Sequence, residues 1–183
     1  MPILKTNASA YSKSVSVDDF RGISITCSSV VSKVFEHCIL DRYGYFISSS
    51  DNQFGFKKKS SCTHAVFTLR SVADYYVNHG STVNTCICAL DISKAFDKMN
   101  HHGLFLKYMQ KRIPLNLLCI LENWFKLCST CIKWGSVVSR IFSVDCGVRQ
   151  GGVLSPYLFA LYVDSIIDRV KDSRIGCYLK GVY

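Results

Sequence analysis

The order of apolar and polar positions predicts a mixture of helices and short strands. Apolar residues recur every three or four positions over residues 28–45, 63–78, 102–112 and 114–126 and from residue 155 onward, which predicts helices there. Alternation or short apolar runs predict strands at residues 2–4, 20–26, 85–90, 131–134, 141–146 and 175–183, with a hairpin turn at Gly135 and Ser136. Elements mixed in this irregular order are typical of an α+β or α/β domain.

The composition is that of a globular chain. Of the 183 residues, 49% are hydrophobic and 19% charged, so one sizeable domain can bury its own core. No apolar run approaches the roughly 20 residues that a membrane helix needs. The first residues, MPILKTNASAYSKS, do not resemble a signal peptide. We therefore expect no membrane segment and an intracellular protein, in the nucleus or the cytoplasm.

The charge balance suggests a polyanionic partner. The chain has 22 Lys and Arg residues against 13 Asp and Glu residues, a net charge of +9. An excess of this size suits nucleic acid, although it also serves solubility. The charge alone does not separate these two interpretations.

The cysteines do not form a convincing metal site. Cys128 and Cys131 make one C-x-x-C pair with no second pair at the right distance, and the adjacent His101 and His102 do not complete it. Zinc is therefore disfavoured. We expect the ten cysteines to be reduced, buried thiols that act as small hydrophobes.

A carboxylate stands at the end of a predicted strand. The apolar run 85–90 ends at Asp91, and a second acid, Asp97, follows six residues later. Asp91 has two interpretations: an acid that caps the next helix, or a ligand for a hard cation such as magnesium at the edge of a sheet. The small Ala95 and the flat Phe96 favour the second interpretation, because they could form the floor of a nucleotide pocket.

A glycine-rich turn precedes the last predicted helix. In GVRQGGVLSPYLFALY, residues 147–162, glycines on both sides of Arg149 and Gln150 allow the backbone to approach a ligand closely. Ser155 and Pro156 then begin a helix whose positive end faces the same place. Such a turn is weak support by itself and gains weight beside Asp91.

Four blocks of sequence, in order, resemble the reverse transcriptase domain of non-LTR (LINE-like) retrotransposons. PILK with DDFRGISI is similar to the opening strands of that family, which typically end Tyr-Arg-Pro-Ile-Ser-Leu. DNQFGFKKKSSCTHAV, residues 51–66, resembles its Gln-Phe-Gly-Phe-Arg block. ALDISKAFDKMNHHGL, residues 89–104, and GVRQGGVLSPYLFALYVDSI, residues 147–166, resemble its first two palm motifs.

The resemblance implies RNA-directed DNA synthesis by a right-hand polymerase, with residues 1–84 mainly as fingers and residues 85–183 as an incomplete palm. Its substrates would be an RNA template, a DNA primer and deoxynucleoside triphosphates. The cofactor would be Mg²⁺, with Mn²⁺ as a substitute. Catalysis would be in-line phosphoryl transfer assisted by two metal ions.

The resemblance also implies roles for residues of this chain. Asp91 would bind metal together with the Ile92 carbonyl, and Phe96 would stack beneath the sugar and exclude a 2′-hydroxyl. Gln150 and Gly151 would hold the incoming nucleotide. In the fingers, Arg21 and Lys57 would face the triphosphate or the template, and Lys58 and Lys59 would bind nucleic acid.

The chain departs from the family pattern in several places. Gly22 replaces the usual Pro, Lys57 the usual Arg, Arg149 the usual Pro and Gly152 the usual Ser. No Phe/Tyr-Ala-Asp-Asp motif, which supplies the second metal-binding acid, is present. The acids Asp164 and Asp168 do not replace it, because we expect them on an outward polar helix face. The alternatives to an active polymerase fragment are a non-catalytic nucleic-acid-binding remnant and an unstable product with no function.

Overall fold

The described part of the chain consists mainly of helices. The structure is a computed structural model and describes residues 2–4, 20–22, 30–79 and 86–176. Its helices are α1 (Val30–Tyr43), α2 (Cys62–His79), α3 (His101–Gln110), α4 (Leu115–Lys126) and α5 (Ser155–Asp172). Each lies where the apolar period predicts a helix, so these five predictions are confirmed.

The strands are short and pair locally. β1 (Pro2–Leu4) pairs antiparallel with β2 (Phe20–Gly22). A hairpin carries two further antiparallel pairs: β3 (Ser129–Thr130) with β6 (Phe142–Ser143), and β4 (Lys133–Trp134) with β5 (Val137–Val138). The hairpin turns at Gly135, whose φ of +58° favours glycine, as the sequence predicts. Helices and small sheets together agree with the α+β class.

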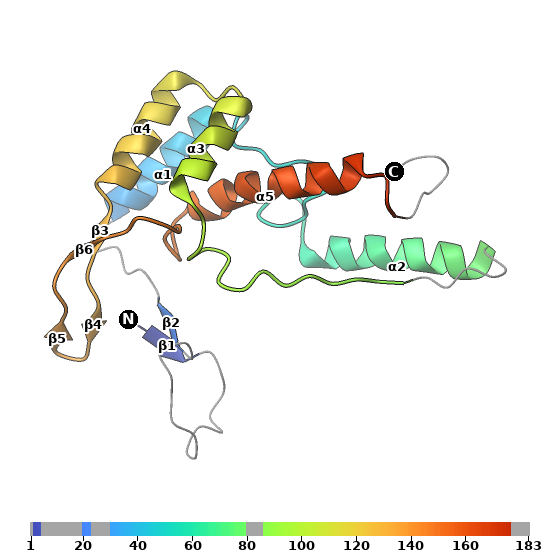
Figure 1. Cartoon of the computed structure of the whole chain (residues 1–183), viewed down its shortest axis with the longest axis horizontal. Helices are drawn as coiled ribbons and strands as arrows, with labels where there is room; N and C mark the ends of the chain where they lie inside the picture. The colour runs from blue at the N-terminus through green and yellow to red at the C-terminus, as the bar shows by residue number, and fades with distance from the viewer. Residues whose placement is uncertain (1, 5–19, 23–29, 80–85, 177–183) are drawn as a thin grey trace, which may run out of the picture.

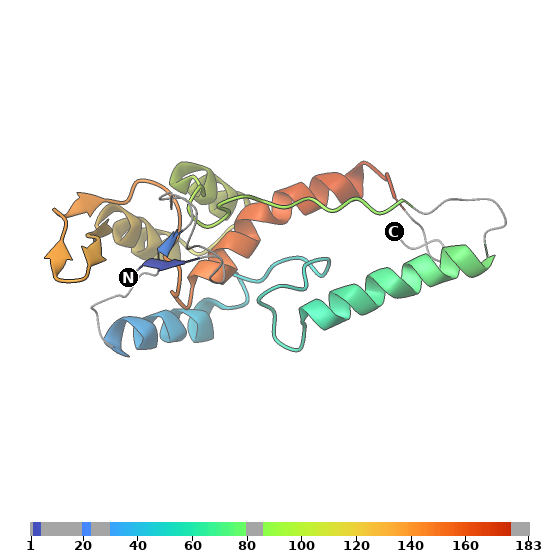
Figure 2. The same cartoon turned by 90° about the horizontal axis from the view of Figure 1, so that it is seen from below.

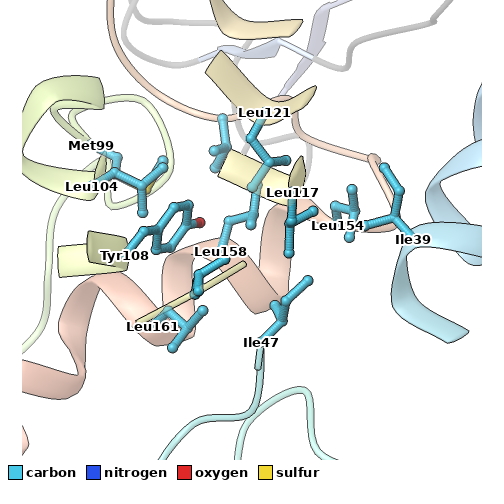
Figure 3. Close-up of a cluster of buried hydrophobic side chains, with 12 residues drawn as sticks. Ile39, Ile47, Met99, Leu104, Tyr108, Leu117, Leu121, Leu154, Leu158 and Leu161 are labelled. Carbon is cyan, nitrogen blue, oxygen red and sulfur yellow. The ribbon is translucent and has the colours of Figure 1, made fainter. Parts of the chain in front are cut away.

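The core lies between α1, α3, α4 and the first half of α5 (Figure 1). Leucines from three helices form its centre, as Figure 3 shows, with Ile39 of α1 and Ile47 of the following turn at one side. Its buried members are Ile39, Ile47, Met99, Leu104, Tyr108, Ile113, Leu117, Leu121, Val148, Leu154, Leu158 and Leu161. Six of them belong to the two sequence blocks that carry the candidate chemistry, residues 89–104 and 147–166, so the core positions the site directly: Met99, Leu104, Val148, Leu154, Leu158 and Leu161.

One predicted strand is wrong. Residues 86–90, expected to form the strand that leads to Asp91, are extended and exposed but form no strand. A strand exists only where a second backbone accepts and donates its hydrogen bonds, and no strand of the described chain pairs with this segment. Of the predicted strand at 175–183, residues 177–183 lie outside the described residues, and residues 175 and 176 form none.

The expectation of buried cysteines is also wrong for most of those described. Cys128 is buried, whereas the other described cysteines are exposed free thiols: Cys38, Cys62, Cys86, Cys88, Cys119, Cys131 and Cys146. Two of them lie on the exposed side of a helix whose other side is buried: Cys119 stands between the buried Leu117 and Leu121 of α4, and Cys38 stands beside the buried Ile39 of α1. Cysteine identity alone therefore did not predict burial here.

Helix α2 lies apart from the core (Figures 1 and 2). None of its residues is buried, although Val66, Phe67 and Val77 are apolar. Its apolar period therefore predicts the helix correctly, but no described element covers that face. In the part of the chain that the structure describes, no helix has both the length and the apolar character to span a membrane.

Candidate functional site

The two sequence blocks that carry the candidate chemistry meet through their backbones. The N–H of Val148 donates to the carbonyl of Phe96 at 2.8 Å, and the N–H of Gly147 donates to the carbonyl of Met99 at 2.7 Å. Asn100 and Cys146 form an antiparallel bridge next to them. About fifty residues of chain separate the two segments, so this pairing brings the two motifs together.

Gly147 permits this close approach. Its φ is +82°, and a Cβ placed there would lie 2.8 Å from the carbonyl oxygens of both Phe96 and Asp97. Backbone atoms cannot yield as the end of a flexible side chain can. Glycine at position 147 therefore satisfies a backbone conformation and a contact distance at once.

The start of α3 fixes the same loop from another side. The Asn100 side chain accepts a hydrogen bond from the N–H of Gly103 at 2.8 Å and caps the helix. The next residue, His101, donates from Nε2 to the carbonyl of Gly147 at 2.6 Å. The His101 ring also packs on Phe125 of α4, with ring centroids 4.4 Å apart. The helix and the loop thus share one anchor point.

A side-chain hydrogen bond joins the motifs as well. Nε2 of Gln150 donates to Oδ1 of Asp97 at 2.9 Å. This bond assigns the amide group of Gln150 to Asp97 and leaves its carbonyl oxygen available to a ligand. Gly151, with φ +96°, follows directly and turns the chain toward α5.

Phe96 lies among aromatic rings. Its ring centroid is 4.9 Å from that of Phe159 on α5 and 6.3 Å, edge-on, from that of Phe56 in the turn before α2. These contacts hold the half-buried ring of Phe96 at a fixed place against two other segments, α5 and the turn before α2.

Asp91 stands in a different environment. Asp91 and Ile92 are exposed and extended, and no described residue donates a hydrogen bond to the Asp91 carboxylate. Asp97, which lies in the turn of residues 93–98, is not paired with Asp91. It accepts the hydrogen bond from Gln150 instead. The residues that the structure describes contain no group of three or more His, Cys, Asp or Glu side chains that could hold a metal ion.

Residues 50–60, the turn before α2, contain Lys57, Lys58 and Lys59 and are called the basic turn below; the three lysines differ in their surroundings. The ammonium of Lys57 donates to the carbonyl of Ser50 at 3.0 Å and to Asp51 at 2.7 Å, and this hydrogen bond and its charge lower the pKa of the Asp51 carboxyl. Lys58 and Lys59 are exposed. A cavity of about 570 Å³ lies beside Lys57 and Lys58, between α1 and the first turns of α5.

Arg21, the remaining residue that the sequence predicts to face the triphosphate or the template, lies in β2. Its Cα is paired with that of Ile3. The structure describes its backbone position only.

A buried carboxylate ties this turn to the helices. Asp164 of α5 is only 1% exposed, so its predicted outward position is wrong, whereas Asp168 is exposed as expected. Asp164 accepts hydrogen bonds from the N–H of Ser50, from Gln53 at 2.6 Å and from the ammonium of Lys111 on α3. Burial acts to raise the pKa of this carboxyl, but these hydrogen bonds and the Lys111 charge outweigh burial and lower it.

Sequence reasoning missed four residues that build this region. Asn100 had a usable signal, because Asn before an apolar helical period is a capping pattern. His101, Asp164 and Glu36, whose carboxylate bonds the N–H of Leu154, act through partners 46 or more residues away. No local pattern reveals such contacts.

Known proteins resemble this chain over most of its length. A family model described as reverse transcriptase (RNA-dependent DNA polymerase) matches residues 4–179. The "Probable RNA-directed DNA polymerase from transposon X-element" of Drosophila melanogaster is 32% identical over 148 residues, which cover 78% of this chain and 16% of that protein. The "Retrovirus-related Pol polyprotein from type-2 retrotransposable element R2DM" of the same species is 28% identical over 160 residues, 86% of this chain and 14% of that protein.

A third relative belongs to another mobile element. The "RNA-directed DNA polymerase from mobile element jockey" of Drosophila funebris is 25% identical over 154 residues, 80% of this chain and 16% of that protein. The chain thus spans 14–16% of the length of these three curated relatives.

We predict that Gly147→Ala destabilises the chain much more than Gly135→Ala. Both glycines have positive φ, but a Cβ at Gly135 would meet nothing within 4 Å. Gly135→Ala should cost about 1–2 kcal/mol, for the backbone conformation alone. Gly147→Ala adds the clash with two carbonyl groups and should cost about 2–5 kcal/mol. Urea unfolding measures both, and equal losses would contradict the close approach.

We predict a pH-dependent stabilisation from Asp164. Its pKa is lowered from 3.8 on folding, so its stabilisation is complete above about pH 5 and is lost as pH falls through the unfolded and then the lower folded value. At pH 7, Asp164→Asn should cost about 1–3 kcal/mol. The gap to the wild type should narrow from pH 5 to pH 3 in urea unfolding. Asp168→Asn, exposed on the same helix, is the control, and a gap independent of pH would refute the role of the charge.

Proposed function

Because this chain belongs to the reverse transcriptase (RNA-dependent DNA polymerase) family, we propose that it forms the nucleotide-binding part of a retrotransposon polymerase that copies RNA into DNA. The resemblance to non-LTR elements is confirmed by the relatives from R2 and jockey elements. The proposed substrates are an RNA template, a DNA primer and deoxynucleoside triphosphates.

The observation that carries this proposal is the junction of the two motifs. Gln150 and Gly151 lie in a loop whose first residues are held by backbone bonds to Phe96 and Met99, and Gln150 donates a hydrogen bond to Asp97. Polymerisation depends on positioning a nucleotide before reaction, which requires such a rigid support. We assign Gln150 and Gly151 to the incoming nucleotide.

Phe96 is assigned to the sugar. A ring held by Phe159 and Phe56 cannot swing aside without losing aromatic contacts on two segments. A fixed aromatic surface is suited to excluding the 2′-hydroxyl, the group that distinguishes ribose from deoxyribose. This role for Phe96 follows the family motif that residues 89–104 resemble.

Asp91 and the Ile92 carbonyl are assigned to a divalent cation. Carboxylate and carbonyl oxygens are the ligands that magnesium prefers, and this ion is usually held by one or two carboxylates together with substrate phosphates. When bound, the cation would neutralise developing charge on the transferring phosphoryl group. The donor set fits a cation but supplies one acid, and the described residues offer no cluster of further acids.

We propose the division into fingers, residues 1–84, and palm, residues 85–183. The basic turn with Lys58 and Lys59 belongs to the first region, and both motifs with Asp91 and Gln150 belong to the second. Arg21 and Lys57 are assigned to the triphosphate or the template backbone. For Lys57 a phosphate would have to replace Asp51, whose exposed carboxylate holds the ammonium.

A second candidate function is nucleic-acid binding without catalysis. The net charge of +9 and the exposed Lys58 and Lys59 favour this function. Binding through such charges requires no metal-binding acid. The two functions differ in whether Asp91 matters, which gives a direct test.

We predict that primer extension requires Asp91. The assay uses an RNA template, a DNA primer and magnesium or manganese. It compares this chain alone with a chimera in which the downstream region of the X-element relative follows residue 183. The chain alone should be inactive, and the chimera should lose about a thousandfold or more in rate on Asp91→Asn. Asp168→Asn is the matched control. Full activity of the Asp91→Asn chimera would exclude the metal role.

We predict salt-sensitive RNA binding through Lys58 and Lys59. Each lysine that neutralises a phosphate on a single strand contributes about 0.7 to the slope of log K against log salt concentration. The double replacement Lys58→Ala and Lys59→Ala should therefore lower that slope by up to about 1.4. Lys57→Ala should change it less, because Asp51 already pairs that ammonium. Lys126→Ala with Lys171→Ala controls for net charge, and equal effects would remove this assignment.

A further inference from the structure

Glu36 is a buried charge whose position the core alone does not explain. It lies in the middle of α1 and is 5% exposed. No Lys, Arg or His of the described chain forms an ion pair with it. Burying a carboxylate is costly unless hydrogen bonds or opposite charge compensate it. The compensation must therefore come from the group that it contacts.

That group is the start of α5. Oε2 of Glu36 accepts a hydrogen bond from the N–H of Leu154 at 2.8 Å, across 118 residues of sequence. Helix α5 has no side-chain cap of its own at Leu154 and no acid in its first turn. The positive end of a helix favours an anion, and unsatisfied N–H groups there need acceptors. Glu36, which belongs to α1, supplies both the negative charge and the hydrogen-bond acceptor.

The carboxylate also lies against the turn that precedes α5. A Cβ on Gly152 would lie 3.4 Å from Oε2 of Glu36 and 2.6 Å from Oγ of Ser155. Glu36, Val148, Arg149 and Leu154 line the same cavity of about 40 Å³, which leaves little free space. The loop between Val148 and Leu154 is therefore packed directly on α1.

We infer that Glu36 is a positioning residue that holds the loop of residues 149–153 in place for its ligand. The inference rests on the proposed function for the role of Gln150 and Gly151, but the contact itself does not. The loop is then attached at its beginning by the backbone bonds of Gly147 and Val148, in its middle by the bond from Gln150 to Asp97, and at its end by Glu36. The residues that would meet the nucleotide lie between the first and the last of these attachments.

Limited trypsin cleavage tests the attachment without any polymerase activity. Arg149 lies inside the loop, and Arg112, in the turn between α3 and α4, is a reference site away from it. Glu36→Ala should raise the native-state cleavage rate after Arg149 by about ten- to a hundredfold relative to that after Arg112, because a hydrogen bond to a charged group is lost. Glu36→Gln keeps an acceptor oxygen but no charge, so its relative cleavage rate after Arg149 should lie between those of the wild type and Glu36→Ala.

The matched control is Glu122→Ala. Glu122 is also a helical glutamate, but it lies half-exposed on α4 and pairs with Lys126. This variant should leave both cleavage rates unchanged. Equal acceleration at Arg149 and Arg112 in Glu36→Ala would show global destabilisation and overturn the inference, as would unchanged cleavage at Arg149.

The chimera provides a second readout. Glu36→Ala should raise KM for deoxynucleoside triphosphate by about tenfold or more and leave the Kd for RNA unchanged. A lower kcat with unchanged KM would contradict a role in positioning the nucleotide. If no chimera polymerises, the proposed function fails, whereas the cleavage ratio still decides whether Glu36 holds the loop.

Discussion

The backbone pairing of residues 96–99 with residues 146–148 is the contact on which the rest of the candidate site depends. It requires Gly147, because any side chain there would meet the carbonyl oxygens of Phe96 and Asp97 at 2.8 Å. With this pairing in place, Gln150 reaches Asp97, His101 reaches the Gly147 carbonyl, and Val148 enters the core. A small loop can therefore hold its side chains in fixed positions, because its first residues, Gly147 and Val148, are already bonded to a second segment where the candidate ligand-binding residues begin.

Helix α5 is held at two points by buried acids that do not belong to the apolar core. Glu36 of α1 satisfies the N–H of Leu154 at its start, and Asp164, ten residues further on, binds Ser50, Gln53 and Lys111. Apolar contacts are not directional, so a leucine face alone allows a helix to slide or rotate at low cost. Each buried carboxylate has a narrow choice of partners, and leaving it unpaired is expensive. The two acids therefore fix the register of α5 against α1, α3 and the basic turn.

The sequence predicted what short-range chemistry determines. The helical period located α1 to α5, glycine located the hairpin turn, and the family motifs identified the two segments that meet. The strand before Asp91 was predicted wrongly, because an apolar run specifies a tendency to extend while pairing needs a second backbone. Asp164 was placed outward because acids are rarely buried, and its partners Ser50 and Lys111 are distant in sequence. Glu36 was missed because its partner Leu154 is 118 residues away and nothing within α1 distinguishes it from an exposed helical glutamate.

The candidate site residues therefore differ in how firmly the described chain holds them. Phe96 is half-buried among aromatic rings, and a hydrogen bond joins the exposed Asp97 to Gln150. Asp91 precedes this turn, in an extended segment where Leu90 is 90% and Ile92 54% exposed. A fixed nucleotide loop lowers the entropy lost on binding, whereas a carboxylate on an unpaired segment must be ordered before it can hold a cation. Assembly of the proposed metal site thus depends on covering residues 86–92, while the loop that we propose for the nucleotide is already formed by contacts within the described chain.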